Sequence, residues 1–191
     1  EGLDASASLF TIEGETLAQA IALPFHLATL IPMVRKIIEE FNLNQMIDGD
    51  IYIMNDPYHG GTHLPDIALI MPIFSGGELI AFSAAMTHHQ DVGGMSPGSV
   101  PTNATEIFQE GIRIPPLKYS SGGIVNETLL KLLKLNVRLP DSFEGDYKIA
   151  LHHGSVHNAS TDAGFTLSNT HVTTKMFEGH DLVLLGDIHK P

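Results

Sequence analysis

Residues 67–89, which decide the fold, read IALIMPIFSGGELIAFSAAMTHH. Two apolar, β-prone runs, 67–74 and 79–89, flank the tetrapeptide at 75–78. A Gly-Gly pair between such runs predicts a tight hairpin, because the turns that match strand twist need positive φ at their centre. Both runs are apolar on both faces, so we expect the hairpin to be covered on both sides.

The turn also predicts which residues face each other across the hairpin. If Ser75 lies opposite Glu78 and the pairing continues without interruption, Asp66 lies opposite Thr87, and Pro65 lies opposite His88. Side chains alternate along a strand, so His63 and His88 would share one face while Asp66 and His89 share the other.

The segments around the hairpin predict an α+β fold with a mixed or antiparallel sheet and two main helices. Apolar residues recur at helical spacing over residues 26–41, with Pro32 within the first two turns. Asn126 is typical of an N-cap and precedes a leucine-rich helix that we expect to end near Arg138. We also expect a polar hairpin around residues 13–15, a strand over 51–55 and an irregular loop over 91–103. Because the chain opens inside an expected strand, we interpret it as a truncated fragment of a larger fold.

Composition excludes several classes of protein. The 191 residues include 22 Asp and Glu against 10 Lys and Arg, for a net charge of −12, which excludes nucleic-acid binding by bulk charge. The longest apolar stretches are interrupted well short of the roughly 18 residues of a membrane span, so we expect no membrane partner. We also expect a cytoplasmic location. Cys is absent, so a metal would have to be held by His, Asp or Glu.

Two clusters of such residues flank the hairpin, in NDPYHGGTHLPD (55–66) and THHQDVGG (87–94). The predicted hairpin brings the clusters together at its open end. Imidazoles and carboxylates without thiolates suit Zn, Mn or Fe(II). Any one of these histidines could be a partly buried, hydrogen-bonded residue with no such role. So many titratable groups converging beside glycines would be costly in a structural core, which favours a metal or catalytic site. The residues are Asp56, His59, His63, Asp66, His88, His89 and Asp91.

Two long stretches resemble a known family. GDIYIMNDPYHGGTHLPDIALIMPIF (49–74) and THHQDVGGMSPGSVPTNATEIFQEGIRIPPLK (87–118) are similar to the B-type subunit of the hydantoinase and 5-oxoprolinase family, which includes a subunit of acetone and acetophenone carboxylases. The resemblance covers residues 1–146. It implies a metal-dependent hydrolase module that opens small cyclic amides together with an A-type partner, which uses ATP to phosphorylate the substrate.

The resemblance also implies roles for individual residues. Its pattern matches metal ligands at Asp56, His63, His88 and Asp91. We assign Asp66, His89 and Glu106 to catalysis; Asp66, His89 and His59 could instead orient the ligands. Glu110 matches the pattern as well. Two alternatives stay open: a subunit of an ATP-dependent carboxylase, and an inactive fragment that keeps only binding surfaces. Hydantoin, 5-oxoproline and ketone substrates are not distinguished.

We expect residues 147–191 to form a second domain, because their composition differs: this segment is rich in His, Thr, Ser and Asn. LHHGSVHNASTDAGF (151–165) and FEGHDLVLLGDIHKP (177–191) weakly resemble the end of a calcineurin-like metallophosphoesterase, whose late metal ligands match His153 and His189. The earlier motifs of that class are absent, so we expect no working phosphoesterase site. Residues 181–188 are long enough for one strand, for which we expect no partner strand nearby.

Overall fold

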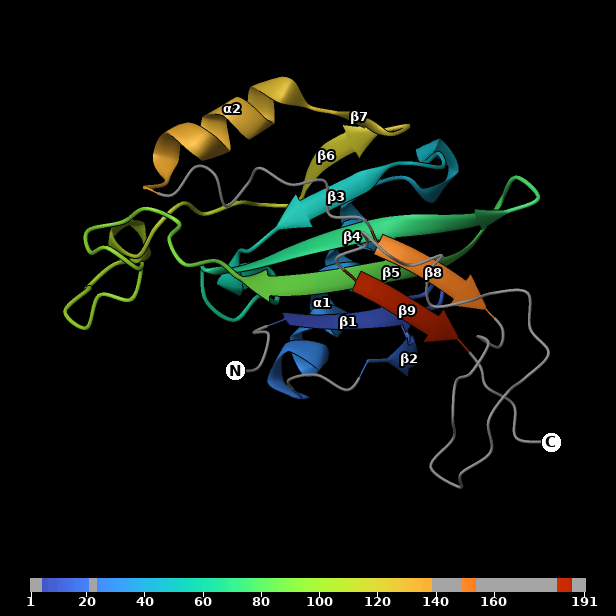
Figure 1. The fold of residues 1–191 in the computed structure, drawn as a ribbon, viewed down its shortest axis with the longest axis horizontal. Helices are drawn as coiled ribbons and strands as arrows, with labels where there is room; N and C mark the ends of the chain where they lie inside the picture. The colour runs from blue at the N-terminus through green and yellow to red at the C-terminus, as the bar shows by residue number, and fades with distance from the viewer. Residues whose placement is uncertain (1–4, 21–23, 139–148, 154–181, 187–191) are drawn as a thin grey trace. The chain divides into compact units, whose positions relative to one another are not determined.

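The structure, a computed structural model, describes residues 5–20, 24–138, 149–153 and 182–186. Residues 1–144 and 145–191 form two units. The first unit contains a seven-stranded sheet in the order β2-β1-β5-β4-β3-β6-β7, and all neighbouring strands run antiparallel (Figure 1). This confirms the predicted α+β class.

The strands are β1 (Ala5–Phe10), β2 (Thr16–Gln19), β3 (Ile51–Met54), β4 (Asp66–Ser75), β5 (Glu78–His88), β6 (Leu117–Ser121) and β7 (Ile124–Val125). The helices are α1 (Pro24–Glu40) and α2 (Glu127–Asn136), with short 3-10 turns η1 (Leu43–Gln45), η2 (Pro57–His59) and η3 (Ile107–Gln109).

The central hairpin of β4 and β5 forms as predicted, with Ser75 opposite Glu78. Gly76 and Gly77 have φ of 60° and 87°, the positive values that a tight hairpin turn requires. The opening hairpin is confirmed as well, because β1 pairs antiparallel with β2.

The predicted register of the central hairpin is wrong beyond its first two pairs. Phe74 pairs with Leu79, but Ile73 pairs with Ala81, so Ile80 is an extra residue in β5. A bulge of this kind shifts every later pair by one residue and reverses which side chains share a face. Asp66 therefore lies opposite His88 instead of Thr87, on the same face as His88 and not on the face predicted for Asp66 and His89. Ile80 is half exposed and neither Gly nor Pro marks the position, so the sequence carries no clear signal for the bulge.

Helix α1 covers one face of the sheet (Figure 1). It runs from Pro24 to Glu40, against the predicted 26–41, and Pro32 lies in its interior. Its buried stripe packs on side chains from β1, β3, β4 and β5 in the larger apolar core. Buried members of the stripe are Leu30, Met33, Val34 and Ile37.

On the other face of the sheet, α2 and loop residues pack on β3, β6 and the first part of β4. Coverage of β5 on this face, and hence of the whole hairpin on both sides, stays a prediction. A second apolar cluster joins Ile67 of β4 and Ile53 of β3 to Leu129 and Leu133 of α2. Asn126 is the N-cap of α2, as predicted, and its side chain accepts a hydrogen bond from the backbone of Leu129 at 3.1 Å. Among the described helices, none is long and apolar enough to cross a membrane.

The second unit contains two described strands, β8 (Ile149–His153) and β9 (Leu182–Gly186). They pair in parallel, with Ile149 opposite Leu182. The prediction that residues 181–188 lack a partner strand is therefore wrong. Parallel strands are joined by long connections, so the partner lies far away in the sequence and a search of the neighbouring residues does not find it. The remaining histidines of the predicted phosphoesterase motifs lie outside the described residues.

The corrected register can be tested by cross-linking, since the chain has no cysteine of its own. Leu69 lies opposite Ala85, and directly opposed residues of antiparallel strands have Cα separations that suit a disulfide. We expect Leu69→Cys with Ala85→Cys to form a disulfide under mild oxidation, detected by mass spectrometry. The control pair, Leu69→Cys with Ala84→Cys, should stay reduced because its side chains point to opposite faces. If only the control pair formed a disulfide, the predicted register without a bulge would be correct.

Candidate functional site

One buried side chain holds the loop between β3 and β4 in place. The Asn55 amide nitrogen donates to the carbonyl of Leu64 at 2.7 Å and to that of Ile112 at 3.0 Å. Its carbonyl oxygen accepts from the backbone nitrogen of Ile114 at 2.6 Å. Asn55 thus joins the loop that carries His63 to a segment nearly sixty residues later in the sequence.

The carboxylate of Asp66, at the start of β4, is completely buried and lies among imidazoles. Nδ1 of His63 and Nδ1 of His88 are each 3.0 Å from its oxygens. Nε2 of His26, on α1, is 3.5 Å away, and the hydroxyl of Thr62 donates a hydrogen bond. The bulge in β5 is what brings His88 directly opposite this carboxylate.

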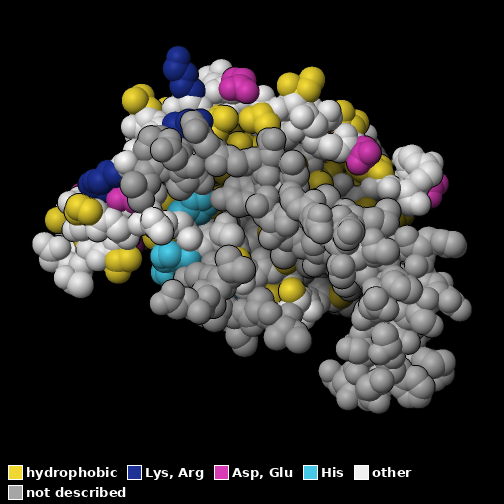
Figure 2. Space-filling model, in the orientation of Figure 1, with side chains coloured by type: hydrophobic (Ala, Val, Ile, Leu, Met, Phe, Trp, Pro, Cys, Tyr) yellow, Lys and Arg dark blue, Asp and Glu magenta, His cyan; other side chains and the backbone are white. Residues whose placement is uncertain are grey.

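His63, Asp66 and His88 together could hold a metal ion. One ligand atom from each lies within 4.8 Å of the others, and the two imidazole rings are 5.1 Å apart between centroids. Two imidazoles and one carboxylate are a donor set found for Zn and Fe(II), with coordination positions left for water or substrate. The His63 side chain is 47% exposed, so a ligand could reach the group from solvent. Histidine side chains are visible on the surface in Figure 2.

Asp56, predicted as a metal ligand, belongs to a different set of contacts. Its buried carboxylate lies 2.8 Å from Nε of Arg113 and 3.0 Å from Nδ1 of His59. The other oxygen accepts from the backbone nitrogen of Tyr58 at 3.0 Å. Asp56 is not part of the His63, Asp66 and His88 group.

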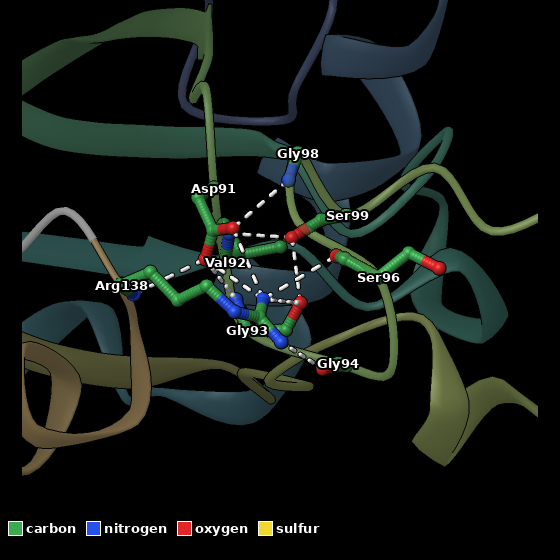
Figure 3. A network of polar contacts seen from close by, with 8 residues as sticks. All are labelled: Asp91, Val92, Gly93, Gly94, Ser96, Gly98, Ser99 and Arg138. Carbon is green, nitrogen blue, oxygen red and sulfur yellow. Dashed lines mark hydrogen bonds and ion pairs between the residues drawn. The ribbon is translucent and has the colours of Figure 1, made fainter.

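Asp91, the other predicted carboxylate ligand, holds the loop after β5 together (Figure 3). It accepts hydrogen bonds from the backbone nitrogens of Gly93, Gly98 and Arg138 at 2.8, 3.0 and 3.1 Å. The guanidinium of Arg138 adds a contact at 3.1 Å and also donates to the carbonyl of Gly94 at 2.6 Å. Burial alone would raise the pKa of the Asp91 carboxyl, but these hydrogen bonds outweigh burial and lower the pKa to about 2.

The described buried aspartates fall into two kinds. Asp50 lies 2.7 Å from Nζ of Lys118, and Asp56 and Asp91 are each paired with an arginine. Within the described part of the chain, the ion-pair partners of Asp66 are histidines alone. A buried carboxylate is costly unless its charge is compensated. Asp66 is therefore the buried carboxylate that has no permanent cation beside it in the described structure.

The two other residues assigned to catalysis lie in different environments. His89 is nearly buried, and its backbone nitrogen donates to the carbonyl of Pro65 at 2.8 Å. Burial, with a smaller contribution from His88, lowers the pKa of His89 to about 4, so its imidazole is neutral at pH 7. Glu106 is exposed and lies at the N-cap of η3. Catalytic roles for both residues stay predictions.

Sequence analysis missed three residues that complete these contacts. His26 had no motif around it, only its position on the buried face of a helix. Arg113 and Arg138 lie far in sequence from Asp56 and Asp91, so only the fold shows that they pair. The chain has only 10 Lys and Arg, so each arginine within the region that resembles the family could have been considered as a partner of a buried aspartate.

The hydrogen bonds to Asp91 predict a specific pH dependence of stability. A carboxyl whose pKa falls from 3.8 to about 2 on folding stabilises the fold above its unfolded pKa and loses that contribution as the pH falls through the folded value. The full loss would be about 2 kcal/mol. In urea unfolding, the free energy of unfolding of wild type should decline between about pH 5 and pH 3 as the first part of this contribution is lost. Asp91→Asn should lack that part of the decline. Asp48→Asn, at an exposed position, is the matched control. The prediction is contradicted if the free energy of unfolding declines equally steeply with falling pH in wild type and in Asp91→Asn.

Comparison with known proteins agrees with this architecture. The family described as Hydantoinase B/oxoprolinase matches residues 1–155. The 5-oxoprolinase of Saccharomyces cerevisiae is 42% identical over 149 residues, which are 76% of this chain and 11% of the yeast protein. The crystal structure of the ATP-dependent caprolactamase from Pseudomonas jessenii superposes with a TM-score of 0.68 and 33% identity, covering 74% of this chain and 24% of that one. A nucleotide-free acetone carboxylase gives a TM-score of 0.67 and 27% identity over 73% of this chain and 19% of the other.

The chain thus spans a quarter or less of these relatives' length. The family match extends past residue 146 and includes His152 and His153, which were predicted to belong to the second domain. The phosphoesterase resemblance of residues 147–191 has no support in these matches. By sequence match and by fold, the chain belongs to the Hydantoinase B/oxoprolinase family.

Proposed function

We propose that this chain is the metal-holding module of an ATP-dependent enzyme that hydrolyses cyclic amides. The observation that carries the proposal is the buried Asp66 carboxylate between the imidazoles of His63 and His88. The relatives support the substrate class, because two of them are named 5-oxoprolinase and ATP-dependent caprolactamase.

His63, Asp66 and His88 would hold a divalent Mn, Zn or Fe ion. When bound, such an ion polarises a carbonyl and lowers the pKa of water. Asp66 would be the carboxylate ligand in place of Asp56 and Asp91, which the family resemblance implies, because those two carboxylates are already paired with arginines. The buried His26 on α1 and the half-buried Thr62 in the loop would then orient Asp66.

The proposal also requires a partner. An unactivated amide is a poor electrophile, and the sequence shows no phosphate-binding loop with the lysine that ATP sites of that type carry. We therefore assign ATP use to an A-type subunit or domain that phosphorylates the substrate and delivers it to this module. The cytoplasm is the location that this requirement for ATP implies.

One second function has a specific observation behind it. The fold superposes on acetone carboxylase about as well as on caprolactamase, so the same module can serve carbon–carbon bond formation. In that case the partner would activate a ketone and bicarbonate instead of an amide.

Metal binding is the direct test of the proposed site. We expect Mn²⁺ or Zn²⁺ to bind to the purified chain, and His63→Ala or Asp66→Asn to weaken binding by about tenfold or more, measured by isothermal titration and elemental analysis. Affinity should fall below about pH 6, because protonated imidazoles cannot ligate. Glu106→Gln, at an exposed carboxylate, is the control and should bind as wild type does. If Asp56→Asn or Asp91→Asn lost the metal while Asp66→Asn kept it, the carboxylate ligands would instead be the expected Asp56 and Asp91.

Dependence on ATP tests the reaction. With the A-type partner present, ring opening of 5-oxoproline should require ATP, and this chain alone should show no turnover. Hydantoin hydrolysis by the chain without ATP would contradict the proposed dependence. Incorporation of labelled bicarbonate into acetone by the assembled complex would support the carboxylase instead.

A further inference from the structure

A second set of polar side chains converges on Asp56, at the other end of the loop that carries His63. The carboxylate of Asp56 is 1% exposed, and it contacts both Nε of Arg113 and Nδ1 of His59. The guanidinium of Arg113 also lies over the ring of Tyr58, 5.0 Å from its centroid. Asp56 thus forms an ion pair with Arg113 and lies beside His59, and the Tyr58 ring supports the guanidinium.

The outer parts of these side chains face solvent. Arg113 is 35% exposed, His59 36% and Tyr58 71%. With Nε directed to Asp56, the terminal nitrogens of Arg113 are the part of the guanidinium left to contact a ligand. An arginine edge of this kind pairs with planar or tetrahedral oxyanions through parallel hydrogen bonds.

The backbone around Arg113 is fixed on both sides. Ile112 and Ile114 are each hydrogen-bonded to the side chain of the buried Asn55, which directly precedes Asp56. The same side chain holds Leu64, next to His63. The backbone at Arg113 is therefore held to the loop that also carries His63, so it would lose little freedom on binding a ligand.

We propose that Arg113, supported by Asp56 and Tyr58 and assisted by His59, binds an oxyanion of the substrate. The inference rests on the proposed function and makes the substrate class narrower: the molecule that reaches the metal group carries a phosphate or a carboxylate. ATP-dependent activation would leave a phosphate on any cyclic amide, whereas a carboxylate is present only on substrates such as 5-oxoproline. The oxyanion is common to both sources, and the experiment separates them.

Ligand binding to the full 191-residue chain in metal-free buffer tests this site independently of the metal centre. The probes are inorganic phosphate, 5-oxoproline, and 2-pyrrolidinone, which is the same lactam without its carboxylate. We expect Arg113→Gln to weaken binding of phosphate, of 5-oxoproline or of both by about tenfold or more, measured by NMR titration. Arg113→Lys should restore only part of the affinity because it keeps the charge but not the planar edge. Arg35→Gln, on the exposed side of α1, removes the same charge and should change nothing.

The outcomes decide the question. A loss confined to phosphate assigns the site to the activated substrate, and a loss confined to 5-oxoproline assigns it to a substrate carboxylate. The proposal is overturned if wild type binds neither probe with a Kd below about 10 mM, or if Arg113→Gln binds both as wild type does. Should Arg113→Gln fail to fold, Tyr58→Ala, at an exposed side chain, replaces it and should weaken the same ligand. Metal affinity, measured in parallel, should stay unchanged in both variants, so a failure of the metal proposal is recognised separately.

Discussion

The contact between the buried carboxylate of Asp66 and the imidazoles around it is the constraint on which the rest of the site depends. A carboxylate without solvent exposure is tolerated only where hydrogen bonds and positive charge compensate it. The imidazoles and the Thr62 hydroxyl surround it, but none of these groups is a permanent cation. A divalent cation would supply that charge. The burial of Asp66 without a permanent cation is thus what supports the proposed metal site, whereas Asp50, Asp56 and Asp91 already have Lys or Arg partners.

Asp66 meets His88 only because β5 contains one extra residue. The two apolar, β-prone runs and the Gly76-Gly77 turn were enough to predict the hairpin, and N-cap chemistry at Asn126 was enough to predict the start of α2. These are local properties of the chain. The bulge at Ile80 is instead a feature of the pairing between β4 and β5 that no local residue pattern marks, so the predicted register and the predicted face of Asp66 were wrong.

The contrast between local patterns and long-range contacts also explains which site residues could be identified from the sequence. The two clusters around residues 55–66 and 87–94 were located, because a hairpin must bring its open ends together. Choosing among their carboxylates was not possible, because Asp56, Asp66 and Asp91 have the same chemistry in a sequence. What separates them is the partner that each one meets, and Arg113 and Arg138 reach Asp56 and Asp91 from far along the chain. Buried ion pairs between distant residues leave no periodic pattern.

Asn55 connects the two proposed sites of the loop between β3 and β4. Its side chain bonds to Leu64, beside His63, and to the backbone on both sides of Arg113. A substrate held at Arg113 would therefore be presented to His63, Asp66 and His88 by a frame whose parts move together. Preorganisation of this kind matters most when a reactive phosphorylated intermediate must be bound and attacked before it hydrolyses elsewhere. The arrangement favours a module that receives an activated, anionic substrate over one that performs the activation itself.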